Sequence, residues 1–84
     1  MSKIIKFDDL IPIWADMLDH RRKSPRLKLK AFDDNREIIG VMVNYTNPAD
    51  NDPEIASIDI DADDGREWMI YQTEVNPDEL ELLD

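Results

Sequence analysis

The sequence predicts a single small α+β domain over residues 1–84, in which an N-terminal helix packs on one face of a four-stranded antiparallel sheet (a meander) and a short C-terminal helical turn follows. Three observations predict this fold class. Apolar residues recur at helical spacing near the start of the chain, they alternate with polar residues from residue 26 onward, and turn-forming residues separate the alternating segments. Because a chain of 84 residues buries only a modest core, one domain accounts for all of it.

The helix is expected over about residues 9–22. Its apolar stripe consists of Leu10, Ile13, Trp14, Met17 and Leu18, at positions i, i+3, i+4, i+7 and i+8. Asp8 or Asp9 can accept hydrogen bonds from the free N–H groups of the first turn, and Pro12 falls where a missing donor costs least. Ser24-Pro25 then ends the helix.

Four strands are expected after the helix, at residues 26–31, 37–46, 55–61 and 66–75. The second of them is apolar on both faces, which is typical of a central strand. Asp33-Asp34-Asn35 and Asp63-Asp64-Gly65 have the composition of hairpin turns, and residues 46–53 form a polar loop with two prolines. In the last strand, Trp68 and Ile70 should point inward.

The two ends of the chain are harder to assign. Residues 4–7 are compatible with a short edge strand or with a hydrophobic staple onto the helix, and both interpretations stay open. Asn76-Pro77-Asp78-Glu79 matches an N-cap, a proline at N1 and a glutamate at N3. The sequence therefore predicts one helical turn through Leu80, Leu82 and Leu83.

Charge is divided unevenly along the chain. Residues 1–30 contain eight Lys or Arg and four Asp, whereas residues 31–84 contain sixteen Asp or Glu and only Arg36 and Arg66 as bases. The net charge of −10 thus combines a basic first third with a strongly acidic remainder. This balance excludes a nonspecific nucleic-acid binder and favours a basic protein as the partner.

Acidic residues gather between residues 50 and 67, on and around the third expected strand. The candidate partner-binding residues are Asp50, Asp52, Glu54, Asp59, Asp61, Asp63, Asp64 and Glu67. Carboxylates at i and i+2 on a strand, such as Asp59 and Asp61, stand about 6.6 Å apart, the same order as neighbouring phosphates along one DNA strand. We therefore expect a row of carboxylates that imitates nucleic acid, with the acids of residues 50–54 beside it if the loop folds back.

Several other classes of function are excluded. The chain has no cysteine, a single histidine (His20), and no phosphate-binding or nucleophile motif. Asp59 to Asp63 begin like a calcium loop, but Asp64 stands at the glycine position and Ile70 at that of the bidentate glutamate. No apolar run reaches the roughly 18 residues that span a bilayer. We expect no catalysis, no metal, no cofactor and no membrane contact.

The basic segment Arg21–Lys30 has a structural explanation. Three of its bases fall at the helix C-terminus and three on the outer face of a strand, where they can pair with acids of neighbouring strands. Trp14 and Trp68 are expected in the core, because each lies on the apolar stripe of its element. If the basic strand of one copy met the acidic face of another, the chain would form a homodimer.

In size, charge and helix-plus-antiparallel-sheet architecture, the chain resembles the small acidic inhibitors encoded by bacteriophages and other mobile elements, among them anti-CRISPR proteins and uracil-DNA glycosylase inhibitor. No shared motif accompanies the resemblance, so it transfers no functional residue. It implies a DNA-mimic inhibitor that occupies the nucleic-acid-binding groove of a host defence or DNA-processing protein in the host cytoplasm. The alternative is a small intracellular adaptor or antitoxin-like domain that docks through a sheet edge or through Leu80, Leu82 and Leu83.

Overall fold

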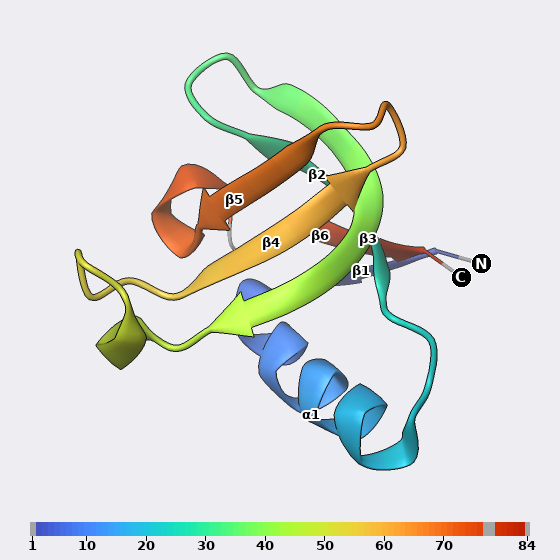
Figure 1. The fold of residues 1–84 in the computed structure, drawn as a ribbon. Coiled ribbons are helices and arrows are strands. Elements are labelled where there is room, and N and C mark those ends of the chain that lie inside the picture. Colours follow the sequence, from blue (N-terminus) through green and yellow to red (C-terminus); the bar gives the residue numbers. More distant parts are fainter. Residues whose placement is uncertain (1, 77–78, 84) are drawn as a thin grey trace.

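The computed structural model describes residues 2–76 and 79–83, and within them one α-helix accompanies a six-stranded antiparallel sheet (Figure 1). The elements are β1 (Lys3–Ile5), α1 (Leu10–His20), β2 (Arg26–Ala31), β3 (Arg36–Thr46), β4 (Ser57–Ala62), β5 (Glu67–Tyr71) and β6 (Leu80–Leu83). Three short 3-10 turns, η1 (Phe7–Asp9), η2 (Pro48–Asp50) and η3 (Gln72–Glu74), connect them. The α+β class is as predicted, but the expected number of four strands is wrong.

The strands lie in the order β1-β6-β2-β3-β4-β5. The predicted meander from β2 to β5 is present, and the two extra strands extend it on the β2 side. β3 curves strongly, so the sheet wraps around its core (Figure 1). The far end of β2 then reaches the segment after β5, where Ala31 pairs with Val75 and the Phe32 N–H donates to the Glu74 carbonyl at 2.7 Å. The sheet is thus curled toward a partly closed barrel.

The prediction of a C-terminal helical turn is wrong for residues 80–83, which form a strand. The Glu79 N–H donates to the Asn76 carbonyl, and the part of the prediction that concerns Pro77 and Asp78 lies outside the described residues. The chain then extends as β6, with Leu82 opposite Leu27 of β2 and opposite Lys3 of β1. Because one helical turn forms few internal hydrogen bonds, a segment this short gains more by pairing with a strand on each side.

The N-terminal segment is an edge strand, one of its two open interpretations. β1 pairs with β6, and the strand alternation leaves Ile4 62% exposed while Ile5 is buried. Phe7, in the turn that follows, is fully buried. The two chain ends therefore lie together at one side of the sheet (Figure 1).

The helix is confirmed close to its predicted limits, but it contacts the sheet less than expected. It ends at Arg21, which adopts the left-handed conformation (φ 51°, ψ 42°) and donates its N–H to the Met17 carbonyl. Of its side chains, only Leu10 is fully buried, whereas Trp14 and Met17 are half-buried. The helix is therefore anchored mainly through its first turn and not along its whole apolar stripe.

The core lies inside the curled sheet and includes residues from every strand. Its buried members are Ile5, Phe7, Leu10, Leu27, Leu29, Ala31, Ile38, Met42, Ala56, Ile58, Ile60, Ile70, Val75 and Leu80. Trp14 and Trp68, predicted as core residues, are partly buried against this cluster. Gly40 allows β3 and β4 to approach closely, because a Cβ on it would overlap the Asp61 carbonyl group and stand 2.6 Å from the Ala62 Cα.

We predict that Gly40→Ala lowers the free energy of unfolding by about 2 kcal/mol or more, because the added methyl group overlaps the backbone of β4. Urea denaturation measures the change. Asn44→Ala, an exposed position on the same strand, is the matched control and should change stability by about 0.5 kcal/mol at most. Equal effects of the two substitutions would show that β3 and β4 do not approach as closely as described.

A second prediction tests the strand assignment at the C-terminus. Leu80→Ala should cost about 2 to 5 kcal/mol, since Leu80 is fully buried between neighbouring strands. Ile4→Ala, on the adjacent edge strand but exposed, should cost less than about 1 kcal/mol. Thermal unfolding of both variants checks this, and a near-neutral Leu80→Ala would contradict the placement of β6.

Candidate functional site

The eight acidic residues singled out from the sequence do not form one row. They fall into three groups, which are the β3–β4 loop (Asp50, Asp52, Glu54), the strands β4 and β5 (Asp59, Asp61, Glu67) and the turn between those strands (Asp63, Asp64). The loop and the turn lie at opposite ends of β4 (Figure 1). Each group therefore has its own surroundings and its own capacity to bind a partner.

The strand group presents its carboxylates on the outer surface of the sheet. In β4, Ile58 and Ile60 are buried, so the alternate residues Asp59 and Asp61 point away from the core. Asp61 stands opposite Glu67 of β5, which places the Cβ atoms of two like-charged side chains about 5 Å apart. We call Asp59, Asp61 and Glu67 the acidic face.

The acidic face lacks a compensating cation. Within residues 2–76 and 79–83, neither Lys, Arg nor His forms an ion pair with Asp59, Asp61 or Glu67. The strand position opposite Asp61 on β3 is Val41, and the one opposite Asp59 on β5 is Met69. The negative charge is therefore left for solvent or for a partner to balance.

Two exposed apolar side chains lie among these carboxylates. Val43 is 44% exposed and Met69 is 50% exposed, and both line a shallow depression together with the acidic face. Val43 follows the buried Met42, so strand alternation points it outward, and the register of β3 and β4 shifts between Met42 and Asn44 so that Asn44, rather than Val43, stands opposite Asp59. The sequence offered a signal for Met69, because it alternates with the inward-pointing Trp68 and Ile70, but none for the bulge.

The turn group is neutralised by arginines. A carboxylate oxygen of Asp63 accepts a hydrogen bond from the guanidinium of Arg26 on β2. Asp64 accepts from the backbone N–H of Arg66 at 3.0 Å, and its other oxygen lies 3.9 Å from the Arg66 Nε. The prediction that Asp63 and Asp64 continue an unpaired acidic row is therefore not met, because both carboxylates stabilise the turn.

The loop group forms a separate acidic surface. Asn51 holds the loop by donating from its amide Nδ2 to the Ile55 carbonyl at 2.8 Å and to the buried Ser57 hydroxyl at 2.9 Å. The acids on either side of Asn51, and Glu54, are exposed. They lie beyond the start of β4 rather than beside the acidic face (Figure 1), so the loop does not fold back, which was the condition for these acids to join the row.

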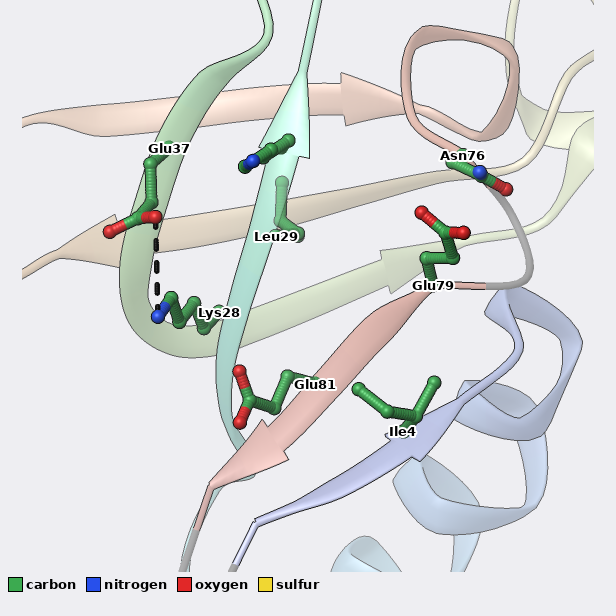
Figure 2. A pocket seen from close by; sticks show the side chains of 8 residues that line it. Ile4, Lys28, Leu29, Glu37, Asn76, Glu79 and Glu81 are labelled. Atoms are coloured by element: carbon green, nitrogen blue, oxygen red, sulfur yellow. Dashed lines mark ion pairs between the residues drawn. The ribbon is translucent and has the colours of Figure 1, made fainter.

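Two of the three basic residues of β2, Arg26 and Lys28, contact acidic residues of other segments, as predicted. Lys28 of β2 approaches Glu37 of the neighbouring β3, with 4.0 Å between Nζ and the carboxylate oxygen. Both line a second depression, shown in Figure 2, where β6 leaves β2 after Lys28 and a wedge opens in the sheet. Glu79 and Glu81 border the wedge on the side opposite Lys28, and Ile4 lies beside Glu81 on the adjacent strand β1. The charges that line the wedge are mixed, so the wedge favours neither an anion nor a cation. The sequence did not predict the wedge, because the wedge depends on β6, which was not expected as a strand.

One titratable side chain near the helix start has a shifted pKa. Burial raises the pKa of the Tyr45 phenol, and the nearby Asp8 carboxylate raises it further. Asp8 itself accepts a hydrogen bond from the Gln72 amide at 3.1 Å. A raised pKa keeps the phenol protonated at neutral pH, so Tyr45 is not suited to act as a general base.

Comparison of the chain with protein-family models, with curated proteins and with solved structures finds no match. Among the described residues, no three His, Asp or Glu side chains are grouped so that they could hold a metal ion. Within residues 2–76 and 79–83, no helix has the length and apolar character needed to cross a membrane. The acidic face is thus the candidate site with the clearest chemistry.

The like-charged pair across β4 and β5 predicts a stability effect. Glu67→Lys should raise the free energy of unfolding at low salt by about 0.5 kcal/mol more than Glu54→Lys, because it replaces repulsion from Asp61 with attraction. The loop variant changes the net charge equally but has no cross-strand carboxylate opposite it. Urea denaturation at low and high salt measures the difference, and identical effects would mean that Asp61 and Glu67 do not interact.

Proposed function

We propose that this chain is a non-enzymatic acidic binding protein that occupies the nucleic-acid-binding groove of a basic host protein, as DNA-mimic inhibitors do. The observation that carries the proposal is the acidic face, three outward carboxylates on adjacent strands with no cation of the described residues paired to them. A basic groove supplies the missing positive charge. Binding then replaces phosphate contacts with carboxylate contacts.

The spacing of these carboxylates suits that role. Asp59 and Asp61 are two residues apart on one strand, about 6.6 Å, and Glu67 stands beside Asp61 on the next strand. This spacing is of the same order as that of neighbouring phosphates along one nucleic-acid strand. Val43 and Met69 add apolar contact area between the charges, which a pure polyanion lacks.

The charge of the whole chain supports fast encounter with such a partner. A net charge of −10 on 84 residues attracts a basic surface over several ångströms and speeds association at low salt. The paired acids Asp63 and Asp64 contribute to this long-range field less than the unpaired ones, because Arg26 and Arg66 offset them. The proposed contact set is therefore the acidic face, with the loop acids as a separate, more distant group.

The second candidate function, an adaptor or antitoxin-like domain, rests on a different feature. Leu80 is fully buried and Leu82 and Leu83 are half-buried in β6, so the C-terminal leucines already pack within the sheet. What remains for docking are the two outer strands of the sheet order, β1 and β5, each of which pairs with another named strand on one side only. An extended segment added there would bind mainly through backbone hydrogen bonds and would depend little on salt.

The test is capture from a nuclease-treated bacterial lysate on the immobilised protein, followed by affinity measurement on the retained protein. The variant Asp59→Asn, Asp61→Asn and Glu67→Gln should bind at least about tenfold more weakly, since it removes three charge-assisted contacts. Asp50→Asn, Asp52→Asn and Glu54→Gln is the matched control, because it removes the same charge from the loop and should retain most of the affinity.

Two further readouts separate the candidate functions. If the proposal holds, duplex DNA displaces the captured protein and the affinity falls steeply between low and moderate salt. Binding that resists both DNA and salt, and that survives the acidic-face variant, would contradict it and favour the adaptor function. Equal losses in both triple variants would place the contact outside the acidic face.

A further inference from the structure

The helix α1 carries more apolar surface than the sheet covers. Leu10, Ile13 and Met17 lie on the side that packs toward the sheet, where Leu10 is fully buried and the other two are half-buried. On the adjacent side Ile11 is 47% exposed and Leu18 is 59% exposed. Figure 1 shows α1 below the sheet with one side turned away from it. About half of the apolar arc of the helix is therefore without a neighbour.

The uncovered residues have the spacing of a helix-docking surface. Ile11, Trp14, Ala15 and Leu18 stand at i, i+3, i+4 and i+7, which puts them in one row along the helix. Trp14 is half-buried and Ala15 is exposed. We call these four residues the helix stripe. The small Ala15 near its centre permits another helix to approach closely.

The charges at the two ends of the helix show what fits this surface. Asp8 and Asp9 precede the helix, whereas His20, Arg21, Arg22 and Lys23 end and follow it. His20 and Arg22 already contact Asp16, at 2.9 and 3.0 Å. Among the described residues, Arg21 forms no ion pair with a carboxylate. Asp8 forms no ion pair with a cation, although it accepts a hydrogen bond from Gln72. The helix thus has, at its start, the Asp8 carboxylate, whose described partner is the neutral Gln72 amide, and, just after its end, the Arg21 guanidinium, with which no described carboxylate pairs.

We infer that α1 is the contact of a two-fold symmetric homodimer, in which the helix stripes of two copies pack antiparallel. In that arrangement Ile11 meets Leu18 of the partner subunit, and Trp14 meets Ala15 of the partner subunit. The same register places Asp8 beside Arg21 of the partner subunit, so apolar contacts and charges agree. The inference does not depend on the proposed function, since the acidic face lies on other elements.

The dimer is expected to be weak and concentration-dependent. A helix of 11 residues is about 16 Å long and buries less than the roughly 800 Å² per partner of a standard stable interface. Two chains of net charge −10 also repel each other, and salt reduces that repulsion. A dimer held by the helix stripe should therefore persist at high salt, unlike one in which a basic strand meets an acidic face.

The inference is tested by analytical ultracentrifugation. The protein is measured over a range of micromolar concentrations, at about 0.15 M and about 0.5 M salt. The double variant Ile11→Gln and Leu18→Gln should raise the dimer dissociation constant at least about tenfold. The matched control is the double variant Val43→Gln and Met69→Gln. It removes two apolar side chains of similar exposure that lie beside the acidic face, and it should leave the dimer unchanged. Circular dichroism checks that each variant is folded.

A charge exchange gives a second readout that does not depend on apolar contacts. Arg21→Asp or Asp8→Arg alone should weaken the dimer several-fold, and the double variant should restore it, because the pair re-forms with reversed sign. A monomer at every concentration, a dimer dissolved by salt, or a dimer unaffected by the helix variants would each overturn the inference. None of these outcomes bears on capture of a basic partner by the acidic face.

Discussion

The register between β3 and β4 is the constraint on which the candidate site depends. Side chains alternate across a strand, so a slip of one residue would exchange Asp59 and Asp61 with the buried Ile58 and Ile60. Gly40 sets this register at one end, because only a residue without a Cβ fits against Ala62. The bulge after Met42 then shifts the pairing by one position, so that Asn44 instead of Val43 stands opposite Asp59. The pairing partners of the acidic face on β3 follow from these two features.

Whether an acidic residue of this fold is paired with a cation depends on where it lies in the sheet. Asp63 and Glu37 have cations within reach because the basic strand β2 lies next to β3 and its first residue reaches the β4–β5 turn, whereas Asp64 has Arg66 beside it in the turn itself. The acidic face lies farther along the sheet, where β3 supplies Val41 and Asn44 rather than lysines. Like charges that remain unpaired on adjacent strands lower stability, and such a cost is common at binding surfaces.

Two surfaces on different elements distinguish this small domain. The acidic face lies on strands β4 and β5 of the sheet, whereas the helix stripe lies on an element anchored mainly by Leu10. Because they share no residues, a change in one surface leaves the chemistry of the other intact. If both proposals hold, a dimer joined at α1 would carry two acidic faces, and a partner with two basic sites would gain affinity from binding both.

The sequence by itself determined the features that arise from local periodicity and composition. Helical spacing from Leu10 located α1, and alternation located the four strands of the meander, because each pattern reflects one buried face. Alternation also put Asp59 and Asp61 on the outside. Tertiary structure decided what depends on contacts between distant segments. Leu80 to Leu83 became a strand because β2 and β1 were available on either side, and Asp63 was neutralised because Arg26 lies near it in space although 37 residues away in sequence. Neither the neighbours of a strand nor the partner of a charge is encoded in local spacing, so only the folded chain could decide them.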